Sequence, residues 1–130
     1  MVHRHQVRVY YEDVDLAGIV YYANYLRFYE RARSEALRAL GVDQTALRAE
    51  GLVFAVSRFE ADYLAPARFD DLLTVETETT RLGAASLEMA QRVLRDGAAL
   101  NRARLRVAFM DVEGRPRRMP PELRDALAGA

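Results

Sequence analysis

Two acidic residues, Asp13 and Asp15, precede the start of an amphipathic helical segment in a chain of 130 residues. The first backbone N–H groups of such a helix, here around Tyr22 and Ala23, have no partner within the helix and carry the positive end of its dipole. Amides of this kind draw charge onto a carbonyl oxygen, while a carboxylate attacks the carbonyl or activates a water molecule. The spacing is compatible with a hydrolytic site in which Asp15 faces the helix amides.

Residues around these acids fit the same prediction, although each also has a simpler interpretation. Gly18 lets the chain bend and lets a ligand approach the backbone closely. Asn24 is suited to cap the helix, which explains it without any contact to a ligand. An Asp-x-Asp segment before a helix is by itself mostly a loop with local bonds from side chain to backbone. On spacing alone, the structural interpretation of Asp15 is therefore favoured over the catalytic one.

We expect neither a metal nor another cofactor at this site. The chain has no cysteine, and its two histidines, His3 and His5, lie in an N-terminal segment that we expect to be frayed. The absence of cysteine also removes thiolate nucleophiles. Catalysis therefore has to rest on oxygen and nitrogen groups.

Length and charge limit the class of protein. A chain of 130 residues has an ordinary size for one domain, here residues 1–130. The formal net charge is zero, so we expect no nucleic acid partner. No segment has the pattern of a signal peptide, and no apolar run approaches the roughly 18 residues that span a membrane. We expect a cytoplasmic protein without membrane insertion.

The apolar pattern predicts one strand, one long helix and then four more strands. Apolar residues alternate from Gln6 to Asp13, which indicates a half-buried strand. Helical spacing then continues to Gly41, a suitable residue just past a helix end. The apolar stripe of this helix comprises Tyr25, Tyr29, Ala32, Ala36 and Leu40, widened by Leu26, Phe28 and Leu37. At roughly 24 Å, the helix is long enough to cross a small sheet.

The second half of the chain is expected to be mostly strand. The four strands are expected over Phe54 to Tyr63, Asp71 to Arg81, Ser86 to Arg95 and Leu100 to Asp111. The dipeptide Asp96-Gly97 favours a tight hairpin between the last two. Short helices are expected near Gln44 to Glu50 and over Pro120 to Leu127. The result is an α+β fold with a five-stranded, mainly antiparallel sheet.

One helix cannot cover a five-stranded sheet well. In a monomer, edge strands and part of an apolar face would be left exposed. We therefore expect a homodimer joined through its sheets or sheet edges, or a homotetramer formed by pairing dimers.

The segment from Tyr11 to Tyr25 resembles the signature of the hotdog-fold acyl-CoA thioesterases related to 4-hydroxybenzoyl-CoA thioesterase and to the Tol–Pal-associated thioesterases. Their pattern Tyr-x-Asp-x-Asp-x-x-Gly-x-Val-x-x-x-x-Tyr is matched without a gap. The resemblance continues through Phe28-Tyr29-Glu30-Arg31-Ala32-Arg33 and returns at Asp62-Tyr63-Leu64-Ala65-Pro66-Ala67-Arg68-Phe69-Asp70-Asp71. It covers most of the chain and implies a hotdog fold, in which a five-stranded sheet wraps around one long helix.

The resemblance also implies an activity, the hydrolysis of an acyl-CoA thioester to free acid and coenzyme A. The family's catalytic carboxylate falls on Asp15, and Asp13 is then structural. The family's carbonyl-polarising amide falls at the start of the helix, on Tyr22 or its neighbour. The expected substrate-binding residues are Gly18, Tyr22, Ala23, Asn24 and Arg81. Whether Asp15 is a nucleophile or a general base stays open.

One position departs from part of the family. Many Tol–Pal-associated members have histidine where this chain has Tyr22, whereas the 4-hydroxybenzoyl-CoA branch tends to have tyrosine. A backbone amide keeps its role with either side chain. We therefore expect a mechanism that does not depend on histidine.

Arginines supply candidate contacts to the phosphates of coenzyme A. All basic side chains of this sequence are arginines, whose planar forks suit phosphate. The resemblance suggests phosphate positions near strand ends and dimer edges, within reach of Arg81 or of Arg115, Arg117 and Arg118. For the whole basic stretch, which also holds Arg102, Arg104 and Arg106, a solvated strand face and turn is the simpler interpretation.

Two other functions remain as alternatives. Hydratases and dehydratases of this fold rely on an Asp/His pair on the long helix, and the expected helix contains no histidine. A non-catalytic acyl-CoA-binding or scaffold module would bind its ligand without releasing a thiol. The aromatic residues near the motif are expected in the core or an interface rather than in an acyl pocket: Tyr11, Tyr21, Tyr25 and Phe28.

Overall fold

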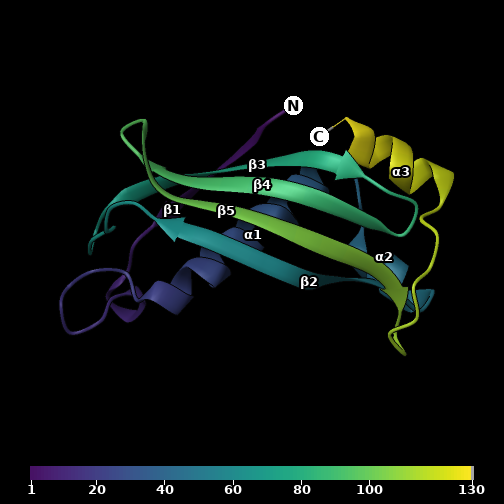
Figure 1. The fold of residues 1–130 in the computed structure, drawn as a ribbon, viewed down its shortest axis with the longest axis horizontal. Helices are drawn as coiled ribbons and strands as arrows, with labels where there is room; N and C mark the ends of the chain where they lie inside the picture. Colours follow the sequence, from purple (N-terminus) through teal and green to yellow (C-terminus); the bar gives the residue numbers. More distant parts are fainter. Residues whose placement is uncertain (130) are drawn as a thin grey trace.

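The computed structural model describes residues 1–129, which form one antiparallel sheet and a long helix against one of its faces (Figure 1). The order across the sheet is β1-β3-β4-β5-β2. Every neighbouring pair of strands is antiparallel. The strands are β1 (His3–Arg8), β2 (Leu52–Tyr63), β3 (Leu72–Leu82), β4 (Ser86–Arg95) and β5 (Ala98–Asp111). The expected α+β fold with a five-stranded sheet is confirmed.

The long helix α1 (Tyr25–Ala39) is amphipathic and buries one side against the sheet. Its buried residues are Tyr25, Phe28, Tyr29, Ala32, Ala36 and Leu37. Leu26 differs from the prediction, because 46% of its surface remains exposed. The helix ends just before Gly41, as expected, and the φ of 80° at Gly41 allows Val42 N–H to bond back to Leu37 O at 3.0 Å.

The core has two parts that follow the length of α1. The first lies around the N-terminal half of the helix and includes Val9, Leu73 and Val75 from the β1 and β3 side. The second lies around its C-terminal end, where α2 (Gln44–Ala49) and α3 (Pro121–Ala128) add their apolar residues. Figure 1 shows α2 and α3 at one end of the sheet and the start of α1 at the other.

The first strand ends earlier than predicted, at Arg8 instead of Asp13. Residues Tyr11–Asp13 form a single 3₁₀ turn, η1, and Tyr11 is 83% exposed. The turn is closed by Asp13, whose N–H donates to Tyr10 O at 3.0 Å and whose carboxylate accepts Tyr10 N–H at 2.8 Å. The expectation of a frayed N-terminus was also wrong, since His3 and His5 pair with β3.

The remaining boundaries agree with the sequence to within two or three residues. Asp96 and Gly97 both have positive φ, 50° and 81°, as a two-residue hairpin of type I′ requires. Within residues 1–129, none of the helices has the length and apolar character needed to cross a membrane.

Candidate active site

Asp15 begins a tight loop that brings the chain back on itself. Val14 and Val20 on its two sides form an antiparallel bridge. Inside it, Asp15 N–H donates to Ile19 O and Gly18 N–H donates to Asp15 O, both at 2.9 Å. Gly18 has a φ of 78°, a conformation that favours glycine. The loop thus holds Asp15 in a defined position beside the chain that leads into α1.

The carboxylate of Asp15 is exposed and only partly engaged. Its Oδ1 accepts Ala17 N–H at 2.9 Å, which is the local loop contact expected of such a segment. Within residues 1–129, no donor contacts Oδ2. One oxygen of this carboxylate therefore remains available to a ligand or a water molecule.

Asp13 has the opposite environment, although only one residue separates the two acids. It is buried, with 5% of its surface exposed, and both of its oxygens are occupied. Oδ2 accepts the Tyr10 N–H at 2.8 Å, and Oδ1 accepts the side-chain N–H of Asn24 at 2.9 Å. These contacts agree with a structural role for Asp13.

Asn24 does not act as the predicted helix cap. It occupies the cap position, but its side chain accepts no bond from a helix amide and donates to Asp13 instead. The charged carboxylate is the stronger partner for that amide group. Asn24 is also buried, so the structure gives no support for a direct contact between its side chain and a ligand.

A short 3₁₀ turn, η2 (Tyr22–Asn24), precedes α1. Its first hydrogen bond runs from Asn24 N–H to Tyr21 O at 2.8 Å. The amides of Tyr22 and Ala23 come before that bond, and no acceptor contacts them in the described part of the chain. They are the free donors that the helix start was expected to offer. Figure 1 shows the Asp15 loop beside this end of α1.

A hydroxyl group that sequence reasoning missed lies directly at the helix start. The hydroxyl of Tyr63, the last residue of β2, donates to Tyr22 O at 2.7 Å. The ring of Tyr63 packs edge-on against the ring of Tyr25. No sequence signal pointed to this contact, because it joins residues 41 positions apart through a backbone carbonyl.

Several large apolar side chains are exposed at the same end of the molecule. Tyr25 and Phe28 are buried in the core as expected, but Tyr11 and Tyr21 are exposed. The exposed group comprises Tyr11, Leu16, Tyr21, Tyr22, Tyr63, Leu64 and Phe69. We call these residues the exposed apolar group. A surface of this kind marks an interaction or ligand site.

The arginines expected at the phosphates lie far from Asp15 within one chain. The Asp15 loop contacts Ala67 and Arg68, just before β3 begins, whereas Arg81 lies near the end of β3, roughly 30 Å along the strand. Arg115 and Arg117 are near the end of β5 and pair with Asp111. A single chain therefore does not bring these arginines to the Asp15 loop.

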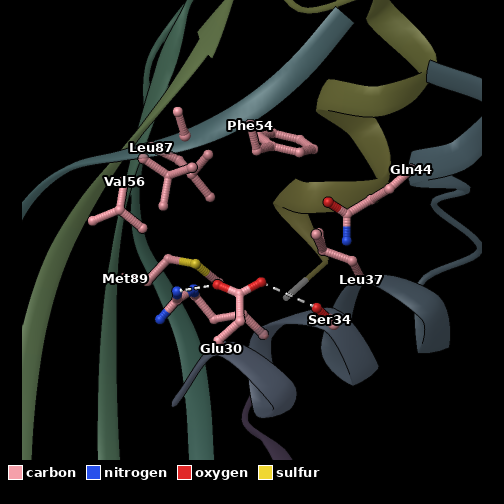
Figure 2. A pocket seen from close by; sticks show the side chains of 11 residues that line it. Glu30, Ser34, Leu37, Gln44, Phe54, Val56, Leu87 and Met89 are labelled. Carbon is pink, nitrogen blue, oxygen red and sulfur yellow. Dashed lines mark hydrogen bonds and ion pairs between the residues drawn. The ribbon is translucent and has the colours of Figure 1, made fainter. Parts of the chain in front are cut away.

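A cavity of about 90 Å³ lies between α1 and the sheet (Figure 2). Glu30, Ser34 and Leu37 project into it from the helix, across from residues of β2 and β4. The carboxylate of Glu30 accepts from Arg33 at 2.6 Å, and burial lowers the pKa of Arg33 despite this pairing. The other labelled wall residues are Gln44, Phe54, Val56, Leu87 and Met89. None of the predicted site residues lines this cavity.

Known proteins that this chain resembles are thioesterases. The model of a family described as the thioesterase-like superfamily matches residues 9–127. Acyl-CoA thioester hydrolase YbgC of Escherichia coli O6:H1 is 43% identical over 122 residues, which are 92% of this chain and 91% of that protein. Acyl-CoA thioesterase YbgC of Haemophilus influenzae is also 43% identical, over 92% of this chain and 90% of that protein.

A solved structure agrees with these relatives. The crystal structure of a probable thioesterase from Bartonella henselae superimposes with a TM-score of 0.88 at 42% identity, covering 92% of this chain and 100% of that one. The expected hotdog fold is therefore confirmed. The chain belongs to the thioesterase-like superfamily and is a hotdog-fold thioesterase.

Proposed function

We propose that this enzyme hydrolyses an acyl-CoA thioester to the free acid and coenzyme A, with Asp15 as the reacting carboxylate. The contrast between the two neighbouring acids carries the assignment. Asp13 is buried with both oxygens bonded, whereas Asp15 is exposed and keeps one oxygen free. A group that must meet a substrate has to be accessible, and Asp15 fulfils this condition. The relatives named as acyl-CoA hydrolases support coenzyme A as the thiol.

The free amides of Tyr22 and Ala23 polarise the thioester carbonyl in this proposal. Negative charge develops on the carbonyl oxygen during attack, and fixed N–H donors stabilise it without reorganisation. The positive end of the α1 dipole adds to the effect. Asp15 and these amides belong to one connected loop, because Val14 bridges Val20 and Tyr21 N–H donates to Asp13 O.

Two chemical routes use the same groups. As a general base, Asp15 removes a proton from water, the water oxygen attacks the carbonyl carbon, and the thiol leaves with a proton after the C–S bond breaks. As a nucleophile, Asp15 forms a mixed anhydride with the acyl group and releases the thiolate, and water then hydrolyses the anhydride. Rapid-quench detection of acyl transfer to Asp15 separates the routes.

Replacement of Asp15 by asparagine tests the assignment. Asp15→Asn keeps the size of the side chain and its contact with Ala17 N–H, but removes the base and nucleophile. Thiol release from a panel of short, long and aromatic acyl-CoAs should fall to the background rate, with binding and thermal stability close to those of the wild type. Retained turnover would falsify the role of Asp15. Binding without thiol release by the wild type would instead indicate a non-catalytic module.

We further propose that the enzyme is a homodimer joined along β2. This strand has 12 residues and forms one edge of the sheet, so its outer N–H and C=O groups lack a strand partner within residues 1–129. A long open edge is a ready site for strand pairing. The exposed apolar group continues from the end of β2, at Tyr63, to the Asp15 loop. A second copy would cover both surfaces, and two such dimers could pair as a tetramer.

Antiparallel pairing about a two-fold axis would bring different parts of the two chains together. Tyr63 of each copy would lie beside the Leu52–Phe54 end of the other β2. Phe54 lines the cavity beside α1, and the Tyr63 hydroxyl donates to Tyr22 O at the start of the helix. Each cavity would then face the Asp15 loop of the second copy, which makes it the proposed pocket for the acyl group. In such a dimer, the Asp15 loop of one copy would share an end of the joined sheet with three arginines of the other copy: Arg81, Arg115 and Arg117.

A mass measurement is the direct test of the dimer. Light scattering at micromolar concentration should give at least twice the mass of 14.8 kDa for one chain. A mass equal to one chain would end the proposal. We also propose a cytoplasmic location and a single domain over residues 1–130.

A further inference from the structure

We propose that Tyr63 is a positioning residue for the hydrolysis. Its hydroxyl holds the Tyr22–Ala23 peptide group, so that the free amides at the start of α1 keep their direction toward the substrate carbonyl. The inference rests on the proposed function, because it assumes that these amides polarise the thioester. It adds the last residue of β2 to the site.

The geometry of one peptide group shows how Tyr63 acts. The hydroxyl of Tyr63 donates to Tyr22 O at 2.7 Å. All peptide bonds in the described residues are trans, so the C=O and N–H of the Tyr22–Ala23 group point in opposite directions. Tyr63 therefore lies behind the peptide, while the Ala23 N–H faces away from it. The hydroxyl acts through the peptide and does not touch the substrate carbonyl.

The helix start needs such an anchor. Before α1 begins, the carbonyl of Tyr21 accepts a backbone bond from Asn24 N–H. That bond fixes the peptide group that contains the Tyr22 amide. Tyr63 fixes the next peptide group, which contains the Ala23 amide. Each free amide thus belongs to a peptide group whose carbonyl accepts a hydrogen bond. A hydrogen bond to the carbonyl also polarises the N–H of the same peptide group.

The direction of the Tyr63 hydroxyl is fixed by packing. Its ring meets the ring of Tyr25 edge-on, with centroids 5.5 Å apart and an angle of 84°. Tyr25 is buried, and its own hydroxyl accepts Ala67 N–H at 3.2 Å. On the other side, Tyr63 pairs with Asn101 of β5. The sheet and the buried ring together aim the hydroxyl at Tyr22 O.

Tyr63 remains a donor over the working range of pH. Partial burial raises the pKa of Tyr63 above its ordinary value near 10, and the neighbouring Tyr22 adds to the rise. The hydroxyl therefore keeps its proton near neutral pH. A deprotonated tyrosine would repel the carbonyl oxygen instead of bonding to it.

Tyr63→Phe is the decisive substitution, because it keeps the ring and removes only the hydroxyl. We expect kcat to fall about 10-fold, in line with the loss of a supporting hydrogen bond behind a reactive group, with KM nearly unchanged. The thermal midpoint should stay close to that of the wild type. Tyr10→Phe is the matched control. Tyr10 is 61% exposed, its hydroxyl has no hydrogen-bond partner within residues 1–129, and its removal should leave kcat unchanged.

A spectroscopic measurement separates positioning from general stability. The probe is a ketone analogue of an acyl-CoA, with CH₂ in place of sulfur and a ¹³C-labelled carbonyl, which cannot be hydrolysed. Bound to the wild type and to Asp15→Asn, its carbonyl stretch should shift to lower frequency, because the amides polarise it. Bound to Tyr63→Phe, the shift should be smaller.

The outcomes distinguish the two proposals. If the analogue binds the wild type without a shift, the amide-polarised mechanism itself fails. If the wild type shows the shift and Tyr63→Phe shows the same shift with wild-type kcat, the mechanism stands and the role of Tyr63 is overturned. A lower thermal midpoint with an unchanged shift would likewise assign Tyr63 to folding alone.

Discussion

At the scale of single residues, the two acids of the motif have different roles: Asp13 is structural, and Asp15 is the proposed catalytic residue. Both carboxylate oxygens of Asp13 accept hydrogen bonds, one from Tyr10 N–H and one from the side chain of Asn24. Asp13 thereby links the end of β1 to the start of α1. One carboxylate oxygen of Asp15 accepts a hydrogen bond within its own loop, and the other remains available to a ligand. The hydrogen bonds of Asp13 therefore stabilise the local structure that positions Asp15.

This division gives a prediction for Asn24→Ala. The substitution removes one of the two donors to the buried Asp13 carboxylate, and an unpaired buried group costs about 1–3 kcal/mol of unfolding free energy. Urea unfolding should show a lower midpoint with an unchanged slope. Asp15→Asn is the control, because Asp15 is exposed and its loss should leave the midpoint almost unchanged. Equal midpoints for both variants would contradict the structural role of the Asp13–Asn24 pair.

The sequence identified the motif residues, and the structure shows why it could not identify all of their partners. Asp13, Asp15 and the helix amides are close along the chain, so their spacing carries the signal. Tyr63 contacts Tyr22 from 41 residues away, through a backbone carbonyl. A contact of this kind leaves no periodicity or motif to read.

At the scale of elements, α1 is both the support of the site and the main link to the sheet. Its midpoint is held by polar contacts in the core: Gln91 donates to Tyr29 O at 3.1 Å and to Thr77 Oγ1 at 2.9 Å. Arg33 adds a bond to Gln91 Oε1 at 3.0 Å. A buried network of this kind is favourable because its members satisfy one another. It keeps α1 in one position along the sheet, which in turn keeps its free amides beside the Asp15 loop.

A second polar contact between helix and sheet predicts the effect of Tyr29→Phe. The Tyr29 hydroxyl donates to Asn101 Oδ1 at 2.6 Å, and both residues are fully buried. The Nδ2 of Asn101 already lacks a partner within residues 1–129. Removing the hydroxyl should therefore leave the whole amide unpaired and cost about 1–3 kcal/mol in unfolding free energy, measured by urea. No change in stability would contradict this account.

The same residue predicts a dependence on alkaline pH. Burial raises the pKa of Tyr29 above its ordinary value near 10, and the neighbouring Tyr25 and Tyr63 add to the rise. Since the folded pKa is the higher one, the contribution to stability is complete below pH 10 and declines as the pH rises further. Between pH 9 and 11, unfolding by urea should show a smaller loss of stability for Tyr29→Phe than for the wild type.

Periodicity and stop signals predicted most elements, and the failures have a local cause. The helix pattern and Gly41 defined α1, and Asp96-Gly97 defined the last hairpin. The predicted end of β1 was wrong because the alternation of apolar residues continues through Tyr11, beyond the end of the strand. The bonds of the Asp13 side chain turn the chain before that point. Side-chain bonds to the backbone compete with strand pairing and are not visible in a hydrophobic pattern.

At the scale of the whole molecule, a single chain holds two incomplete halves of a site. One end of the sheet presents Asp15, the free amides and the exposed apolar group. The middle of α1 holds the cavity, which begins at Glu30, about 10 Å along the helix from Ala23. The sequence could not predict this cavity, since its walls come from elements far apart in the chain. Pairing along β2 would join the cavity of one copy to the catalytic loop of the other.

Mixed dimers test whether the two halves come from different chains. Asp15→Asn removes the carboxylate and leaves the cavity intact. Ser34→Phe should fill the cavity that Ser34 lines and leave Asp15 intact. Each variant alone should be inactive toward a substrate that needs the cavity. After the two are unfolded together and refolded in equal amounts, half of the dimers should be mixed, and each should carry one complete site.

The expected thiol release is therefore about a quarter of the wild-type rate, the share that random pairing about a two-fold axis predicts. The same refolding of either variant alone is the control and should give no activity. If Asp15 and the cavity of the same chain formed the site, every chain in the mixture would carry one defect. The mixture would then stay inactive although light scattering still showed dimers, and the shared site would be excluded.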